Sequence, residues 1–261
     1  IGIKNAKNKL VIRIDAHSII SNFKDKDFFL DISKKISTNK YSMIGFKQRF
    51  IFKTIFEASL FVLSFTYFLS KSSYRYTNKE IASYDTAWLF AIKKEDAKSV
   101  NYINTEAIIN EDYDFCQRLI NYKKKPILIY PEFPIYYLPR PNIIALAQQY
   151  YKYGYGRVQT EYRLDRINSS LVDLILYIFT LIFIVAFFIM TLSNLKFFLL
   201  ILFINFTCTI YQLRIDTLGF SRRNLLSKNL IIGILISPFI APIPFFFRTI
   251  GKAKYIIKNL F

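Results

Sequence analysis

The sequence predicts an α/β domain followed by C-terminal transmembrane helices, and three observations carry this prediction. A strand-like run from Lys9 to Ile14 ends in Asp15. An acidic segment beginning at Asn110 has the residue order of a helix start, because Asn at the N-cap and acids in the first turn offset unpaired amides and the helix dipole. Long uncharged stretches follow residue 171. The predicted organisation is a globular part over 1–148, an interfacial amphipathic segment over 149–170 and a membrane region over 171–261.

Two polar residues follow the strand-like run near the start of the chain. Asp15 and His17 follow its carboxyl end, where a parallel α/β sheet places its ligands. A carboxylate oxygen there suits Mg²⁺ or Mn²⁺ bridging a diphosphate. The alternative is an acid in a strand-to-loop turn with a solvent-facing histidine. Both interpretations remain open for the pair.

The predicted helix that begins after Asn110 carries a second acidic pair, Glu111 and Asp112. A hydroxyl that attacks an acetal carbon must lose its proton, and a carboxylate within hydrogen-bond reach can accept it. On local pattern alone, the favoured interpretation is that these acids only start the helix. The surrounding sequence favours the chemical role for Asp112.

The interfacial segment is rich in tyrosine and basic residues. Between 150 and 162 it carries five tyrosines, interspersed with Lys152 and Arg157. Such a mixture suits a helix at the lipid headgroup level ahead of the first span. Stacking of one or two tyrosines on sugar rings is the alternative.

The membrane region contains three predicted hydrophobic segments, at about 171–193, 196–213 and 229–247. Residues 174–195 hold no charge and as a helix would span the roughly 30 Å hydrocarbon core. The third segment carries three prolines, so we expect a broken or re-entrant helix. Residues 50–69 are also apolar, but Lys53 and Glu57 within them favour a helix packed on the soluble part.

Composition and charge agree with a membrane protein. The chain is 53% hydrophobic and 18% aromatic, with only 21% charged residues and a net charge of +18. Residues 171–261 hold nine Lys/Arg against two Asp, and these basic residues border apolar stretches. Anionic lipid attracts such flanks, so we expect membrane lipid as a partner and no nucleic acid. The distribution predicts a multi-pass membrane protein with a cytoplasmic globular part.

Several short motifs follow one another along the first 160 residues. They are Val11-Ile12-Arg13-Ile14-Asp15-Ala16-His17, Tyr74-Arg75, Tyr84-Asp85-Thr86, Glu111-Asp112-Tyr113 with Arg118-Leu119, Tyr137-Leu138-Pro139-Arg140 and Gln149-Tyr150-Tyr151-Lys152-Tyr153-Gly154. This order resembles the family 2 glycosyltransferases, inverting enzymes of the GT-A (Rossmann-like) fold. It is most similar to the membrane-bound exopolysaccharide type known from succinoglycan biosynthesis.

The resemblance implies roles for individual residues. Asp15 matches the first acid of a divalent-metal site that holds the nucleotide diphosphate, and His17 stands where many relatives have a second acid. Asp112 matches the general base, and Glu111 would help to orient acceptor or base. Gln149 lies in a segment similar to a Gln-x-x-Arg-Trp acceptor-binding element, although Lys152-Tyr153 replaces Arg-Trp.

Further substrate-binding candidates are Asp85 and Tyr153, which lie in the matching segments. Arg118, Arg140 and Arg157 are candidates for binding phosphate, since guanidinium groups pair bidentately with such oxygens. Each of the three arginines could equally be a surface or headgroup-facing charge.

The implied activity is that of a hexosyltransferase-type enzyme. It would use a nucleotide sugar, expected to be a UDP-sugar, and a lipid-linked or polysaccharide acceptor. Fourteen residues precede Asp15, too few for the family's first nucleotide-binding βα units, so the sequence predicts an N-terminally truncated fragment without activity of its own. The alternative is a catalytically inactive, membrane-anchored relative that binds a partner.

Overall fold

A computed structural model describes the chain over residues 2–15, 18–20, 26–65, 80–105, 107, 109–194, 196, 199–200, 203 and 228–260. The chain divides into two compact units. The first unit comprises residues 1–51 and 74–138, and the second comprises residues 52–73 and 139–261.

The first unit is built on a mixed sheet with six strands in its described part. Its order is β1-β5-β3-β6-β2, and β4 also pairs with β6. The strands are β1 Leu10–Arg13, β2 Ser18–Ile20, β3 Ile44–Phe50, β4 Ile81–Ser83, β5 Phe90–Lys93 and β6 Ile127–Tyr137. Among these, β3 and β6 run parallel and the other pairings are antiparallel. The prediction of a parallel sheet is therefore wrong for most described pairings, because the alternation of side chains along a strand does not encode strand direction.

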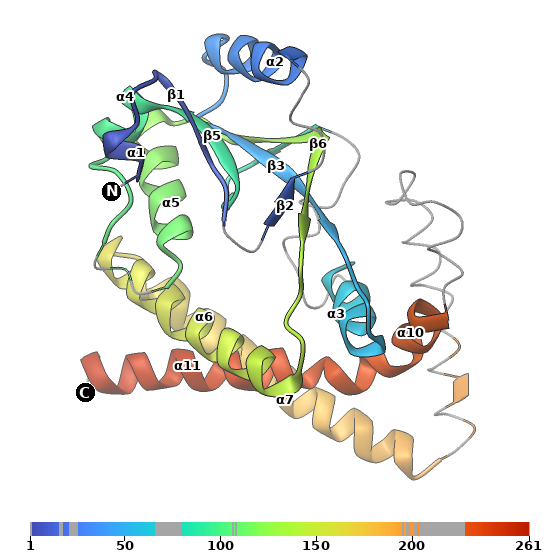
Figure 1. Ribbon diagram of the computed structural model, residues 1–261. Coiled ribbons are helices and arrows are strands. Elements are labelled where there is room, and N and C mark those ends of the chain that lie inside the picture. Colours follow the sequence, from blue (N-terminus) through green and yellow to red (C-terminus); the bar gives the residue numbers. More distant parts are fainter. Residues whose placement is uncertain are drawn as a thin grey trace. The chain divides into compact units, whose positions relative to one another are not determined.

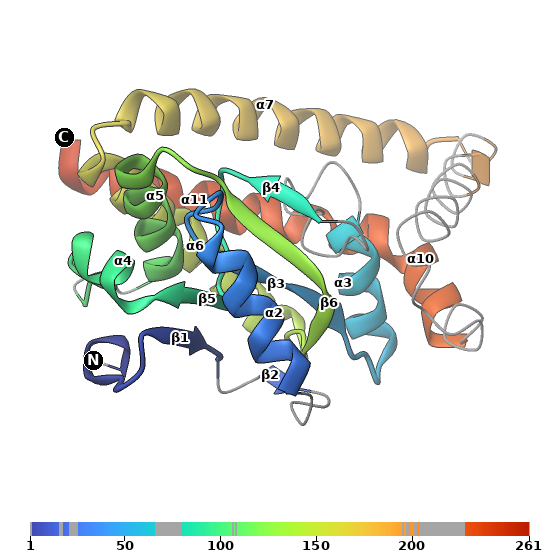
Figure 2. The same cartoon turned by 90° about the horizontal axis from the view of Figure 1, so that it is seen from above.

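Two helices cover opposite faces of this sheet. Successive side chains of a strand point to opposite faces, so Phe90 and Ile92 pack toward α5 (Glu111–Lys123) while Leu89 and Ala91 pack toward α2 (Lys26–Ser37). The two short helices of this unit are α1 (Gly2–Asn5) and α4 (Lys94–Ser99). The arrangement, which can be followed in Figures 1 and 2, confirms the prediction of a mixed α/β domain.

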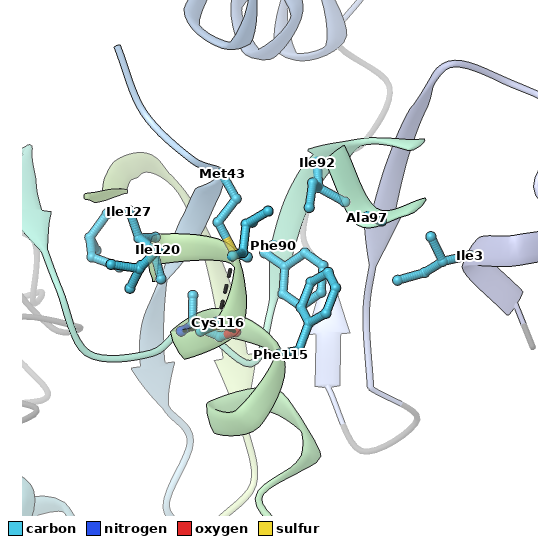
Figure 3. Close-up of a cluster of buried hydrophobic side chains, with 12 residues drawn as sticks. Ile3, Met43, Phe90, Ile92, Ala97, Phe115, Cys116, Ile120 and Ile127 are labelled. Atoms are coloured by element: carbon cyan, nitrogen blue, oxygen red, sulfur yellow. Dashed lines mark hydrogen bonds between the residues drawn. The ribbon is translucent and has the colours of Figure 1, made fainter. Parts of the chain in front are cut away.

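The core beneath α5 fixes the rotation of that helix. The Phe115 ring stacks on the Phe90 ring with centroids 5.5 Å apart, and both side chains are fully buried. Figure 3 shows these rings side by side, and on the same face of α5 Cys116 lies beside Met43, which precedes β3. Because α5 is held through this face, its first turn lies at a defined place relative to the strands.

The second unit consists of five described helices. They are α3 Ile55–Phe65, α6 Ile143–Arg163, α7 Ile167–Leu192, α10 Lys228–Ile240 and α11 Pro242–Leu260. Helices α6 and α11 cross with their backbones in contact, because each contributes a glycine at the crossing. A Cβ on Gly154 would collide with the carbonyl oxygen of Arg248, and one on Gly251 with that of Tyr151.

One helical stretch of the described residues, Lys228–Asn259, is long and apolar enough to cross a membrane by length and composition. It comprises α10 and α11, and it bends at Ala241, where the prolines predicted an interruption. The predicted segment 171–193 coincides with α7 up to Leu192, and Leu171–Ile182 is a shorter apolar stretch within that helix. Most of the predicted segment 196–213 lies outside the described residues.

The unit boundaries differ from the sequence-derived domains. The apolar run expected to pack on the soluble part forms α3, which belongs to the second unit and packs against α10. Gly233 of α10 sits against the backbone of Ala58, so the two helices approach closely. The charges Lys53 and Glu57 lie at the start of this helix, where the Glu57 carboxylate accepts hydrogen bonds from the Lys53 and Thr54 amides.

Candidate functional site

Two acidic segments far apart in the sequence meet at one arginine. Arg13 ends β1, Asp15 follows it, and Glu111 begins α5. Nη2 of Arg13 lies 2.8 Å from Oε1 of Glu111 and 3.3 Å from Oδ1 of Asp15. The structure therefore brings Asp15, which follows β1, and Glu111, which begins α5, to one guanidinium.

Packing of the sheet explains this meeting. Arg13 pairs with Phe90 in the β1–β5 register, and its guanidinium lies over the Phe90 ring at 5.8 Å. The same ring stacks on Phe115 of α5. One aromatic ring thus orients both the strand that carries Arg13 and the helix that carries Glu111.

The helix start is locally encoded as well. Asn110 precedes α5 in the left-handed region at φ 61°, a conformation that asparagine tolerates better than most residues. Glu111 and Asp112 then occupy the first turn, where the helix dipole favours negative charge. Both side chains are half-buried, so they face the solvent boundary rather than the core.

The electrostatics of the site centre on Arg13. Burial acts to lower the pKa of the guanidinium, but Asp15, Glu111 and Asp112 outweigh it and leave the pKa of Arg13 raised. Asp112 therefore lies near enough to act on the same cation. The side chains of Arg13, Asp15 and Glu111 are 17%, 23% and 35% exposed, which leaves the carboxylates accessible to a ligand.

The backbone carbonyl of Asp85 is hydrogen-bonded to a side chain of α5. Nε2 of Gln117 donates to the carbonyl oxygens of Asp85 at 2.7 Å and Tyr84 at 3.0 Å. The buried thiol of Cys116 accepts from the Ala87 amide at 3.4 Å. The 84–87 loop is thus bound to the helix that carries Asp112, which joins two of the motifs recognised in the sequence.

Arg118 is engaged within the fold. Its guanidinium donates to Oδ2 of the buried Asp114 at 2.7 and 2.9 Å and to the carbonyl oxygens of Tyr102, at 2.9 Å, and Val100. These bonds fasten the left-handed turn at Asn101 and Tyr102 to α5. The arrangement favours a structural role over the phosphate-binding role predicted from sequence.

The remaining predicted residues lie in the second unit or outside the described residues. On α6, Nε2 of Gln149 donates to the hydroxyl of Tyr153 at 2.8 Å, so the two acceptor-side candidates contact each other. Arg140 is exposed ahead of α6, and Arg157 pairs with Glu161 at 3.4 Å. His17 and the Tyr74-Arg75 motif fall outside the described residues.

One carboxylate of the site, that of Asp15, could contribute to a divalent cation whose other ligands are substrate oxygens and water. Among the described residues no group of three His, Cys, Asp or Glu could hold a metal. Magnesium, however, is commonly bound through one or two carboxylates together with substrate phosphates and water. Asp15 supplies such a carboxylate, and three acids outnumber the single guanidinium.

Sequence reasoning missed Arg13 as a member of the site. The sequence signal for Arg13 was a charge inside the apolar run Val11-Ile12-Arg13-Ile14. Arg13 also precedes Asp15 by two residues, and in an extended chain residues two apart point to the same side. The partner, Glu111, lies 98 positions away. Comparison of the chain with protein-family models and with curated proteins finds no match.

Proposed function

We propose that this chain is a hexosyltransferase-type glycosyltransferase of the family 2, GT-A type. It transfers a sugar, with inversion, from a nucleotide-sugar donor such as a UDP-sugar to a lipid-linked or polysaccharide acceptor. The observation that carries the proposal is the convergence of Asp15 and the Glu111-Asp112 pair on Arg13. A base at the start of a helix and an acid able to contribute to a metal-bound diphosphate, within one site, would serve a single in-line displacement.

Asp112 acts as the general base in this reaction. The acceptor hydroxyl gives its proton to the Asp112 carboxylate while its oxygen bonds to the anomeric carbon. The bond from that carbon to the diphosphate oxygen breaks on the opposite face, and its electron pair leaves with the diphosphate. Attack and departure on opposite faces invert the configuration at the anomeric carbon.

The neighbouring residues position these groups. Glu111 is engaged by Arg13, which fixes the first turn of α5 and so the location of Asp112. Asp15 would hold a divalent ion, and Mg²⁺ or Mn²⁺ when bound would stabilise the charge on the departing diphosphate. Gln149 and Tyr153 of α6, which contact each other within the second unit, are kept as acceptor-binding candidates on the sequence resemblance alone.

The candidate crossing Lys228–Asn259 supports a location at the membrane. Positive charges flanking apolar segments support a plasma-membrane protein with a cytoplasmic catalytic part. A membrane site suits a lipid-linked acceptor and a role in exopolysaccharide or cell-surface glycan synthesis.

The test is release of nucleoside diphosphate by the full-length protein in its membrane. We expect turnover with one of a panel of nucleotide sugars, dependent on Mg²⁺ or Mn²⁺. Asp112→Asn should lower turnover at least about 10³-fold, since it removes the base but keeps the shape. Asp165→Asn, at an exposed turn after α6, is the matched control and should retain turnover. A folded protein without turnover on any donor would instead support the inactive, partner-binding alternative.

A further inference from the structure

Two helices of the second unit, α7 and α11, carry charges at the ends of long uncharged stretches. Residues 174–195 and 229–247 hold no charge, Asp173 comes just before the first stretch, and Arg248 comes just after the second. Nζ of Lys252 lies 3.2 Å from Oδ2 of Asp173, which brings the charged ends of the two stretches to the same level. A bilayer that takes up both stretches places these charges among the lipid headgroups.

The cations at this level outnumber the acids that pair with them. Arg157 of α6 and Arg248 both act on the charge of Lys252. Arg157 pairs with Glu161 at 3.4 Å, and Lys252 pairs with Asp173. Arg248 forms no ion pair with a carboxylate among the described residues. One positive charge is therefore left over where α6, α7 and α11 pack together.

The guanidinium of Arg248 is held in place but lacks an acceptor. Its Cζ lies 5.4 Å from the centre of the Tyr177 ring, and Nζ of Lys252 lies 4.7 Å from the same centre. A Cβ on Gly154 would collide with the Arg248 carbonyl oxygen, so the backbone is fixed against α6. Nε of Arg248 is buried without a hydrogen-bond partner among the described residues. Because buried donors are nearly always paired, this guanidinium suits an acceptor that the chain does not supply.

We infer that Arg248, with Lys252 beside it, binds the phosphate group of a lipid where α6, α7 and α11 meet. Phosphate oxygens pair bidentately with a guanidinium, and the surplus charge favours an anionic headgroup. Ile175 and Phe179 of α7 are exposed and offer apolar surface for the lipid chain. The inference rests on the membrane location within the proposed function and not on sugar transfer.

Two lipids carry this chemistry. One is an anionic phospholipid of the bilayer, and the other is a lipid-linked acceptor whose chain ends in a phosphate ester. Phosphatidic acid and farnesyl phosphate are matched probes, because both are phosphate monoesters and they differ only in the lipid part. The probe that the protein binds more tightly identifies the source of the phosphate.

The experiment measures lipid binding to the full-length protein in a neutral detergent by native mass spectrometry. Phosphatidylcholine is the reference, since its choline group offsets the phosphate charge. We expect wild type to bind at least one of the two monoesters about tenfold more tightly than phosphatidylcholine. With that probe, Arg248→Gln should lose at least about tenfold in affinity. Lys258→Gln, which removes an exposed cation near the end of α11, should stay within about twofold of wild type.

A second variant separates a phosphate site from general attraction by positive charge. Arg248→Lys keeps the charge but lacks the guanidinium fork, so it should lose at least about threefold in affinity. Melting temperatures establish that each variant is folded. Arg248→Lys keeps a cation beside Tyr177 and carries the comparison if Arg248→Gln does not fold.

Wild-type affinity in folded Arg248→Lys, or equal losses in Arg248→Gln and Lys258→Gln, would overturn the inference, because charge alone would then explain the binding. A wild-type protein that binds neither monoester more tightly than phosphatidylcholine would overturn it too. Nucleoside diphosphate release by the same preparation keeps the proposed function distinguishable. Turnover without a preference for the monoesters would overturn this inference alone, and a phosphate site in a protein without turnover would overturn only the sugar transfer.

Discussion

At the start of α5, Asp114 is almost fully buried, with 2% of its side chain exposed, and Arg118 of the next turn neutralises it. Removing one partner of such a pair leaves an uncompensated buried charge, which costs far more than the pair itself contributes. The arginine also bonds two loop carbonyls. The free energy of unfolding, rather than catalysis, should therefore report on this residue.

We predict that Arg118→Met lowers the free energy of unfolding by about 3 kcal/mol, measured by denaturant titration of the full-length protein. The double variant Arg118→Met/Asp114→Leu should recover part of this loss, because it removes the orphaned charge as well. Undiminished stability of Arg118→Met together with a raised donor KM would restore the phosphate-binding role predicted from sequence.

Lys47 of β3 gives a second prediction, which concerns pH. Its side chain is buried at 4% exposure, and burial, followed by the nearby Arg49, lowers its pKa from 10.5 to about 8. The unfolded chain therefore binds this proton more tightly than the native chain. Burial of Lys47 therefore destabilises the folded protein most below about pH 8, where the lysine is charged in both the folded and the unfolded state. This destabilisation shrinks as the pH rises from about 8 toward 10.5, so the free energy of unfolding increases over that range.

We predict that Lys47→Met raises the free energy of unfolding at pH 7 by about 2 kcal/mol and flattens its rise between pH 8 and pH 10. The measurement is thermal unfolding across that pH range. Lys40→Met, at an exposed position, is the control and should leave both the stability and its pH dependence unchanged. A pH dependence identical in Lys47→Met and wild type would contradict this account of the buried lysine.

At the scale of elements, the crossing of α6 and α11 depends on two glycines. Alanine normally stabilises a helix interior relative to glycine by about 1 kcal/mol. At Gly251, however, the added Cβ would meet the Tyr151 carbonyl, so the two helix backbones would have to separate. Backbone atoms cannot yield as a flexible side-chain end can, and the steric cost should exceed the gain in helix propensity.

We therefore predict that Gly251→Ala lowers the melting temperature. Gly2→Ala is the matched helical control, since a Cβ on Gly2 of α1 meets no atom within 4 Å, and it should leave the melting temperature unchanged or slightly higher. Equal effects of the two substitutions would mean that the helices do not cross at this glycine.

Elements were also the level at which the sequence was most informative. The acids after Asn110 predicted the start of α5 at Glu111, and the prolines predicted the break between α10 and α11. Both signals are local, since acids near a helix start and missing amides act within one turn, although the Asn110 side chain makes no cap hydrogen bond. Strand direction and the partners of Arg13 and Arg118 depend on residues distant in the chain. Local pattern therefore identified the acids of the candidate site, but not the arginine that joins them.

At the scale of the whole molecule, the second unit contains long helices that are rich in exposed apolar side chains. Helix α7 exposes large apolar side chains along its length, including Ile175, Phe179 and Ile182. Exposed apolar surface of this extent marks contact with lipid or a partner. Together with the candidate crossing Lys228–Asn259, the exposed apolar surface of α7 favours insertion into the bilayer over peripheral binding.

We predict that the full-length protein stays in the membrane pellet after extraction at alkaline pH and high salt. Such conditions remove proteins bound through headgroup electrostatics, whereas a spanning helix is retained. Complete release into the supernatant would mean that the basic residues, rather than the apolar helices, hold the protein at the membrane.

We propose that Asp15, which follows β1, and the acids that start α5 form one sugar-transfer site. The most direct measurement is nucleoside diphosphate release by wild type, Asp15→Asn, Asp112→Asn and the double variant, all in the full-length protein. Residues that act as a unit are strongly non-additive, so each single variant should lose at least about 10³-fold and the double variant little more than the worse single variant. Full turnover in either single variant, or losses that multiply in the double variant, would contradict the claim.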